Sequence, residues 1–297
     1  MNDLLFGMNV SISAARGTDA VRDACRAERS GFDFVSLNDH PATDGPVYEA
    51  WTLLCWIAAH TETIAIAPRV LAVPLRLPAL VAKSSESLDR LSGGRVILAL
   101  GSGGSPEELE RLGVERASSA TRTTGLEEAV RIIRELWSGD EIALSGDVFQ
   151  VARLRLEPKP ARKIPIWLGT FGRRGLRITG ALADGWIPSL GYSPEEHLPE
   201  MRARVVEAAI GARRSEGDVR CLLNMGVHVG ETAAEDAGLV SGSASQVVER
   251  LIGFVEMGFR GFNFVAQGDD LETQVRMLGD DVLPEVREFA LSATTNR

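Results

Sequence analysis

The sequence predicts a (β/α)8 barrel, the TIM barrel fold. Three observations favour it: eight short apolar runs alternate with helical patterns, the chain has 297 residues, and no shift in composition marks a linker. Fully apolar strands between helices are typical of a parallel sheet that helices cover on both faces. Eight such units in one chain of this length are typical of the barrel. The alternative is a doubly wound open sheet, which would normally need fewer strands or a second domain. We therefore expect one barrel domain over residues 1–297.

The predicted strands are short runs rich in β-branched and other apolar residues, which suit a buried pleated surface. They cover residues 6–12, 33–37, 63–73, 95–101, 164–169, 185–189, 219–229 and 261–266. Helical spacing follows the first three of them, over residues 18–32, 47–60 and 78–94. Thr18 is the expected N-cap of the first helix, and Pro78 and Gly93 suit the beginning and the end of the third.

The alternation stops after the fourth strand. We interpret residues 102–163 as an insertion, with an amphipathic helix in "GLEEAVRIIRELWSG" and a hairpin that turns at Ser145–Asp147. The alternation resumes with the fifth strand. The helix after the fifth strand is expected to end near Ala183. The three later helices are expected to cover residues 193–214, 243–258 and 271–290.

Composition and charge restrict the kind of partner. The formal net charge of −9 argues against nucleic acid as the main partner. Three scattered cysteines, Cys25, Cys55 and Cys221, show neither a metal-ligand spacing nor a disulfide framework. The N-terminal residues do not resemble a signal peptide, and no apolar run is long enough to span a membrane. We expect a cytoplasmic protein with a small-molecule substrate, without a metal site, and with neither nucleic acid nor membrane as a partner.

Candidate site residues follow the predicted strands, because the active site of such a barrel lies at the carboxyl ends of its strands. His40 follows the second strand beside Asn38 and Asp39, and a histidine there can transfer protons near neutral pH. Alternatively, neighbouring carbonyl groups satisfy its ring and it has no chemical role. The "GSGG" after the fourth strand would let a flat ligand approach the backbone closely, or it is an ordinary strand-to-loop transition.

A glycine-rich loop with two arginines, "LGTFGRRGLRITG", follows the fifth strand and leads into a helix. The free N–H groups and the positive dipole end of such a helix attract phosphate, and arginines add forked hydrogen bonds. The alternative is a tight turn with solvated arginines. In barrels the phosphate site more often follows strands seven and eight.

Four segments together resemble the bacterial luciferase-like family, whose members use FMN or the deazaflavin coenzyme F420. They are "GFDFVSLNDHP", "PLRLPALVAKSSESLDRLSGGRVILALGSG", "SGDVFQV" and "PIWLGTFGRRGLRITGALADGWIPS". The resemblance covers nearly the whole chain. It implies a luciferase-like TIM barrel with an insertion after strand four, and a coenzyme ring at the carboxyl ends of the strands.

The resemblance also assigns expected roles to residues. His40 would lie near the reactive ring as the catalytic residue. A non-proline cis peptide is expected within Arg69–Leu71, behind the ring. The loop after the fifth strand would hold a phosphate group. The expected cofactor-binding residues are Asn38, Asp39, Val70, Leu71, Ser102, Gly103, Gly169, Thr170, Gly172, Arg173, Arg174 and Gly175.

One departure concerns the substrate. In some sugar-phosphate dehydrogenases of this family, a glutamate directly follows the "G-[ST]-G" after strand four and acts as an acid. Here Gly104 stands in that place, and Glu107 and Glu108 follow a little later. The resemblance therefore does not favour that substrate class.

The resemblance is closer to the deazaflavin branch, through "NDHP" and "GRRG" and the short chain. It implies an F420-dependent oxidoreductase that transfers a hydride to or from a small organic substrate, with Arg76, Arg173 and Arg174 suited to the acidic tail of the coenzyme. The alternatives are an FMNH2-dependent monooxygenase supplied by a separate flavin reductase, and a non-catalytic flavin-binding relative. Members of the family are often dimers, so a homodimer is expected.

Overall fold

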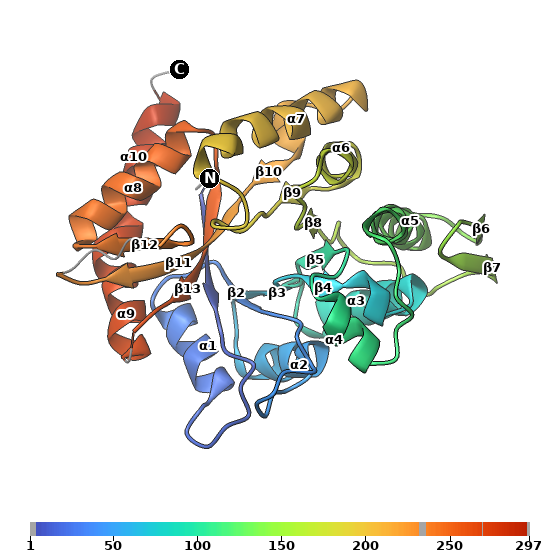
Figure 1. The fold of residues 1–297 in the computed structure, drawn as a ribbon. Helices are drawn as coiled ribbons and strands as arrows, with labels where there is room; N and C mark the ends of the chain where they lie inside the picture. Colours follow the sequence, from blue (N-terminus) through green and yellow to red (C-terminus); the bar gives the residue numbers. More distant parts are fainter. Residues whose placement is uncertain (1–3, 232–235, 269, 296–297) are drawn as a thin grey trace.

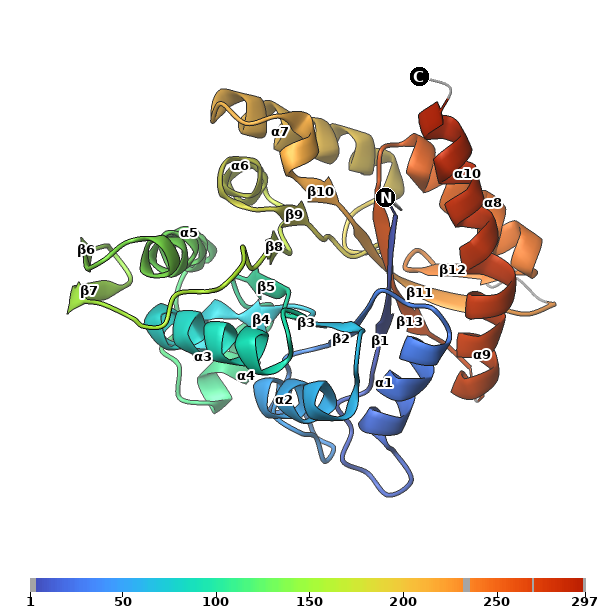
Figure 2. The same cartoon turned by 180° about the vertical axis from the view of Figure 1, so that it is seen from behind.

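A ring of parallel strands surrounded by helices forms the molecule (Figures 1 and 2). The structure, a computed structural model, describes residues 4–231, 236–268 and 270–295. The strands are β1 Leu5–Asn9, β2 Phe34–Leu37, β3 Ala65–Pro68, β4 Leu71–Ala72, β5 Leu98–Gly101, β6 Ile142–Ser145, β7 Gln150–Leu154, β8 Ile166–Leu168, β9 Gly185–Trp186, β10 Arg220–Cys221, β11 Leu223–Val229, β12 Leu239–Gly242 and β13 Gly261–Ala266.

The α-helices are α1 Ala20–Arg29, α2 Ala50–His60, α3 Pro78–Leu91, α4 Pro106–Arg111, α5 Ser119–Ser138, α6 Arg173–Leu182, α7 Leu198–Gly211, α8 Ala244–Glu256, α9 Leu271–Met277 and α10 Leu283–Thr295. Short 3-10 turns cover Val73–Leu75, Glu195–His197 and Glu216–Asp218, and a π-helical turn joins α9 to α10. Among the described residues, no helix combines the length and the apolar character that crossing a membrane requires.

The barrel closes through two single bridges between its sheets. One sheet has the order β12-β11-β13-β1-β2-β3 and the other β10-β9-β8-β5-β4. Ile66 of β3 bridges to Val96 just before β5, and Ser189 just after β9 bridges to Asn224 of β11, both in parallel. In the described part of the chain the ring therefore consists of β1, β2, β3, β5, β8, β9, β11 and β13, with β4 and β10 as continuations of β3 and β11. The predicted (β/α)8 barrel is confirmed.

The segment between β5 and β8 includes an outer helix of the barrel. Helix α5 lies between α3 and α6 (Figure 1): Trp137 Nε1 donates to the Ala82 carbonyl of α3, and Arg134 Nε donates to the Leu182 carbonyl of α6, each at 3.0 Å. The predicted hairpin is present as the antiparallel pair β6–β7. The insertion expected over 102–163 thus contains the helix that covers the sheet between β5 and β8.

Three local features differ from the expectations. The N-cap of α1 is Asp19, whose side chain accepts from the Arg22 amide, so the choice of Thr18 was wrong by one residue. The last helix is interrupted at Leu278–Val282, where Pro284 supplies no N–H for a regular α-helical hydrogen bond. The short strand β12 pairs in parallel with β11 and was not predicted.

The barrel interior has an apolar layer with a polar layer above it. Phe34, Ala67, Ile97, Ala99, Trp167, Ile187 and Leu222 form the apolar layer. The polar layer lies above it, nearer the carboxyl ends of the strands. There Ser36 Oγ donates to Asn263 Oδ1 at 2.9 Å, and Asn263 Nδ2 donates to Asn224 Oδ1 at 2.8 Å. All three are buried, and because side chains alternate along a strand they point into the barrel. The mouth therefore has a hydrogen-bonded floor.

Candidate functional site at the mouth of the barrel

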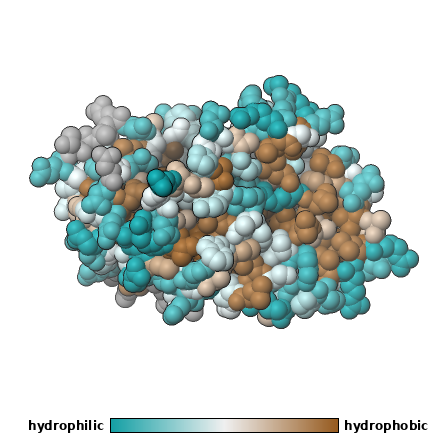
Figure 3. Space-filling model, turned by 90° about the horizontal axis from the view of Figure 1, so that it is seen from below, coloured by the Kyte–Doolittle hydropathy of each residue, from teal (hydrophilic) through white to brown (hydrophobic). Residues whose placement is uncertain are grey.

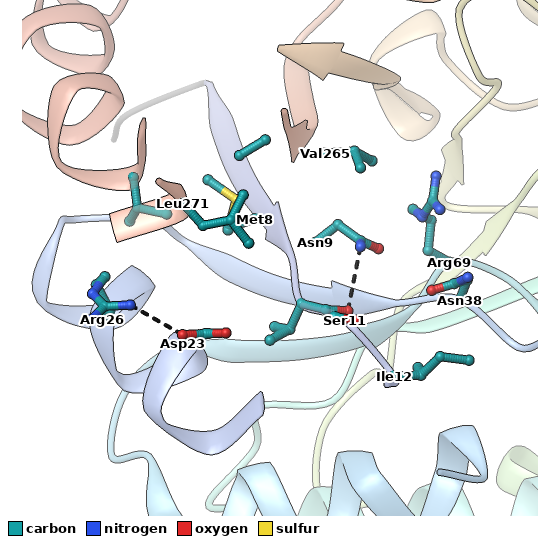
Figure 4. A pocket seen from close by; sticks show the side chains of 13 residues that line it. Met8, Asn9, Ser11, Ile12, Asp23, Arg26, Asn38, Arg69, Val265 and Leu271 are labelled. Carbon is teal, nitrogen blue, oxygen red and sulfur yellow. Dashed lines mark hydrogen bonds and ion pairs between the residues drawn. The ribbon is translucent and has the colours of Figure 1, made fainter. Parts of the chain in front are cut away.

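A cavity of about 300 Å³ lies at the carboxyl ends of β1, β2, β3 and β13 and is also lined by residues of α1 and α9 (Figure 4). Its walls combine apolar side chains with a few polar ones, as binding sites for small molecules usually do. The lining residues are Met8, Asn9, Val10, Ser11, Ile12, Asp23, Arg26, Asn38, Arg69, Val265, Ala266, Leu271 and Val275. Asn38, a predicted site residue, is among them.

His40 is paired with a carboxylate that sequence reasoning did not connect to it. Its Nδ1 lies 2.7 Å from Glu108 Oε2, and Glu108 Oε1 accepts the Ala42 amide at 3.1 Å. The side chain of His40 is 47% exposed and that of Glu108 is 14% exposed. A carboxylate in this position holds the imidazole ring in one orientation.

The short helix α4 brings Glu108 to His40. Ser105 caps this helix by accepting the Glu108 amide at 3.2 Å, and Pro106 occupies its first turn. The "S-P-E-E" at residues 105–108 matches the pattern of a capping box. That pattern was a signal for the helix, but the Glu108 side chain contacts His40 rather than the cap.

Asp39 is fully buried and bound within the protein. Arg76 grips both of its oxygens, at 2.5 and 2.9 Å, and the Ala72 amide donates to it at 2.8 Å. Arg76 also contacts Glu49 at 2.6 Å. Burial lowers the pKa of Arg76, but Asp39 and Glu49 outweigh burial and raise it. Asp39, predicted to contact the coenzyme, thus anchors the loops after β2 and β3 that carry His40 and Val70.

Val70 lies between two neighbouring strands, and the peptide bond before it, Arg69–Val70, is cis, as expected. A Cβ atom at Gly101 would lie 2.6 Å from Val70 Cγ2, and one at Gly169 would lie 3.3 Å from it. These two glycines therefore make room for the Val70 side chain. Leu71, by contrast, is buried in the outer core, paired in register with Leu100.

Ser102 and Gly103 leave β5 at the same end of the barrel. Gly103 has φ +84°, and a Cβ there would lie 3.1 Å from Leu109 of α4. The positive φ explains why glycine stands there. Ser102 is partly exposed.

The loop from Gly169 to Gly175 combines a rigid base with an open helix end. Thr170 is buried, with its Oγ1 2.8 Å from Thr179 Oγ1, and its carbonyl accepts Trp186 Nε1 at 2.9 Å. Gly175 packs against Thr170, where a Cβ would lie 2.9 Å away. Gly172 is the N-cap of α6 and makes no side-chain cap, so no side chain of this residue covers the N–H groups of the first turn.

Beside this helix end lies a groove of about 540 Å³ between α6 and α7, here called the arginine groove. It is lined by Arg173, Arg174, Arg177, Arg204, Glu207 and Ala208. Arg174 contacts Thr124 and Glu127 of α5, and Arg204 pairs with Glu200. In the described part of the chain, Arg173 and Arg177 have no ion pair. Glu207 also lines the groove, so its lining holds four arginines against one carboxylate, although the whole chain carries a net charge of −9.

The remaining polar candidates are further from this arrangement. His228 Nδ1, on β11, donates to the Gln267 carbonyl at 3.1 Å. Within residues 4–231, 236–268 and 270–295, no group of three histidine, cysteine or carboxylate side chains could hold a metal ion. Arg69, Asn9 and Asn263 were not predicted as site residues; their strand-end or inward positions were the available signal.

The fold and the polar mouth define the class of a TIM barrel with a ligand site at the carboxyl ends of its strands. The chain belongs to the luciferase-like monooxygenase family, whose model matches residues 7–237. It is 28% identical to an F420-dependent glucose-6-phosphate dehydrogenase of Microbacterium testaceum (strain StLB037), over 96% of this chain and 98% of the relative. It is 30% identical to a 5,10-methylenetetrahydromethanopterin reductase of Archaeoglobus fulgidus, over 75% of this chain and 67% of the relative.

A solved structure shares the fold over almost its whole length. An F420-dependent secondary alcohol dehydrogenase in complex with an F420–acetone adduct superposes with a TM-score of 0.84, at 21% identity, over 95% of this chain and 99% of that one. This likeness supports the luciferase-like barrel assignment.

Proposed function

We propose that this protein is a coenzyme F420-dependent oxidoreductase that transfers a hydride between the deazaflavin and a small organic substrate. The observation that carries the proposal is the pair of His40 and Glu108 at the barrel mouth, 2.7 Å apart. The names of the relatives give the coenzyme, and the pair gives the proton chemistry that a dehydrogenase needs.

His40 would serve as the proton carrier. When bound, the deazaflavin supplies a carbon that accepts or releases a hydride. A substrate alcohol that loses a hydride from carbon also loses the proton of its hydroxyl group. Because Nδ1 of His40 is held by Glu108 and no described residue bonds its Nε2, Nε2 is available to take that proton. In the opposite direction, Nε2 returns the proton to the carbonyl oxygen.

The donor set beside α6 fits an anionic coenzyme. The first-turn N–H groups of α6 and the side chains of Arg173 and Arg177 would hold the phosphate and the acidic tail. Val70 and the cis peptide before it would form the wall behind the ring, and Asn38 would face its polar edge. Asp39 would act through the loops that it anchors.

Direct binding tests separate the coenzymes. Titration of the purified protein with F420 and with FMN, followed by fluorescence, should show tighter binding of F420. A monooxygenase needs a shielded, dry pocket, whereas the His40 side chain is 47% exposed; substrate-dependent oxygen uptake with FMNH2 would overturn the proposal. Tight F420 binding without turnover, in the wild type as in His40→Ala, would instead indicate a non-catalytic relative.

We also propose a homodimer formed through the outer faces of α2 and α3. Trp56, Leu80 and Leu91 are 59%, 64% and 85% exposed, and Figure 3 shows apolar side chains gathered on the lower face of the molecule, where α2 lies in Figure 1. Exposed apolar surface of this kind often marks an interface. Light scattering should give twice the chain mass for the wild type and the monomer mass for Leu91→Glu.

The proposed location is the cytoplasm. It is supported by Cys25, Cys55 and Cys221, which are all free thiols in the structure.

A further inference from the structure

The mouth cavity contains a guanidinium group without a counterion. Arg69 follows β3 and lines the cavity beside Asn38 (Figure 4). Its Nε is closed off from solvent and has no hydrogen-bond partner, and no carboxylate among the described residues pairs with it. Arg26 lines the same cavity but is neutralised by Asp23 and Glu272, at 3.1 and 2.6 Å. Arg69, unlike Arg26, therefore leaves its guanidinium group available to an anionic ligand.

Arg69 as a whole is partly buried, but its Nε is cut off from solvent without a hydrogen-bond partner, and a polar atom left in that state is costly. Burial lowers the pKa of Arg69, and the nearby Tyr192 only partly opposes this. A desolvated guanidinium presents a planar fork of donors, which matches the two oxygens of a carboxylate. A bound carboxylate would thus supply the hydrogen bonds and the counter-charge that the Arg69 guanidinium group lacks in the folded protein.

The other lining residues of the cavity indicate what kind of molecule carries the carboxylate group. Met8, Val10, Ile12, Val265 and Leu271 give the cavity a mainly apolar surface. Its volume of about 300 Å³ is at the lower end of the range for small-molecule sites. An apolar body of a few carbon atoms fits such walls better than a bare phosphate ion or a polyhydroxylated sugar.

Asn9 adds a second unsatisfied atom to the same cavity. Its Nδ2 donates to the Val10 carbonyl at 3.3 Å, which fixes the orientation of the amide. Its Oδ1 is buried without a partner. The cavity therefore offers one free cation and one free acceptor for a hydrogen-bond donor, both within the described part of the chain.

We propose that this cavity binds the substrate as a small organic carboxylic acid, with the carboxylate on Arg69 and the apolar body against the β1 and β13 walls. The proposal rests on the proposed function, which puts the reacting carbon near His40. Asn38 lines the cavity two residues before His40 and thereby connects the two parts of the site. Arg69 is then the residue that determines specificity for acids.

Calorimetry on the coenzyme-free protein tests the proposal. The probes are benzoate and butyrate, each compared with its neutral amide, and inorganic phosphate. We expect the acids to bind at least about tenfold more tightly than the amides, and Arg69→Met to weaken the acids by about tenfold or more. Arg29→Met removes the same charge from the exposed face of α1, outside the cavity, and should change binding by less than about twofold.

Two further measurements keep the test decisive. The melting temperature of Arg69→Met should equal or exceed that of the wild type, since an Nε without a hydrogen-bond partner is removed; a large loss would show a structural role and overturn the proposal. F420 titration of the same variant should give wild-type affinity, and loss of F420 binding would assign Arg69 to the coenzyme instead. Phosphate binding that depends on Arg69 without binding of the acids would overturn the carboxylic acid class.

The failure of the proposed function has a separate signature. If the wild type does not bind F420, the coenzyme assignment fails, whatever calorimetry shows. If the wild type binds F420 but binds neither benzoate nor butyrate, the carboxylic acid proposal fails and the coenzyme assignment stands.

Discussion

Glu108 Oε2 lies 2.7 Å from His40 Nδ1, although 68 residues separate them in the chain. The loop after β2 carries the histidine and helix α4 carries the glutamate. Gly104 occupies the place directly after "GSG", where some relatives have the acidic residue, and α4 returns a carboxylate to the mouth from four residues further on. Helix α4 thus brings a carboxylate to the mouth from a segment that the strand-end pattern does not indicate.

Glu108→Gln should lower kcat/KM by about tenfold to a hundredfold, because an amide replaces the carboxylate that orients the His40 ring. The affinity for F420 should stay unchanged, since Glu108 lies outside the arginine groove. Steady-state kinetics and fluorescence titration measure the two effects. Glu107→Gln is the matched control: its side chain is exposed one residue away, and kinetics within twofold of the wild type are expected, as a rough allowance for a surface change. Equal losses in both variants would contradict a specific role of Glu108.

Gly101→Ala should destabilise the protein by about 1–3 kcal/mol, because the added Cβ would lie 2.6 Å from Val70 Cγ2. Displacing Val70 should also weaken binding of F420. Urea unfolding and coenzyme titration are the measurements. Gly104→Ala has no atom within 4 Å of the added carbon, so its stability should change by less than about 0.5 kcal/mol. A stable Gly101→Ala protein with normal coenzyme affinity would show that Val70 can move freely.

Neutralising two side chains of the arginine groove, in Arg173→Gln with Arg177→Gln, should weaken F420 binding by about tenfold or more at low salt. The difference in affinity between the variant and the wild type should shrink as salt is raised, because salt screens the attraction between the arginines and the coenzyme in the wild type. FMN, which carries one phosphate and no acidic tail, should be affected less. Arg29→Gln, an exposed arginine on α1, serves as the charge-matched control. An equal loss for both coenzymes would place only the phosphate, and not the tail, at these arginines.

Asp184 should make the stability of the fold depend on acid. Burial alone would raise its pKa, but Lys163, the Ile166 amide and Arg134 hold the pKa below its usual value of 3.8. Because the folded state keeps the carboxylate charged where the unfolded chain binds a proton, this stabilisation is complete above about pH 4 and is lost as the pH falls further. Asp184→Asn should cost about 2–4 kcal/mol at pH 7 and flatten the decline below pH 4. Unfolding at several pH values, with the exposed Asp140→Asn as control, tests this; parallel curves would contradict it.

The barrel could be predicted from the sequence because each strand is short, apolar and followed by a helical pattern. The same argument placed His40, Asn38 and the Gly169–Gly175 loop at one end, since parallel strands share their carboxyl ends. That loop does lie beside a basic groove, which includes Arg177 and Arg204 from the following turns of α6 and α7. Spacing along α6 could have indicated Arg177; the approach of α7 could not be foreseen.

Other parts of the site depend on tertiary structure that no local pattern encodes. The direction of α4 after its Ser105 cap decides where Glu108 lies, and it belongs to a segment without repeating units. Arg69 looks like any strand-end arginine in the sequence, and no local pattern shows that it lines a cavity together with residues of β1 and β13. Asp39 was expected at the coenzyme. The segment "NDHP" gives no sign that Arg76 binds both oxygens of its carboxylate.

The walls of the mouth cavity come from β1 and β13, which pair directly although they are the first and last strands of the barrel. During synthesis on the ribosome, the chain therefore cannot complete this cavity until its final strand has emerged and docked. Nascent or cleaved molecules that lack β13 are left without one side of the cavity.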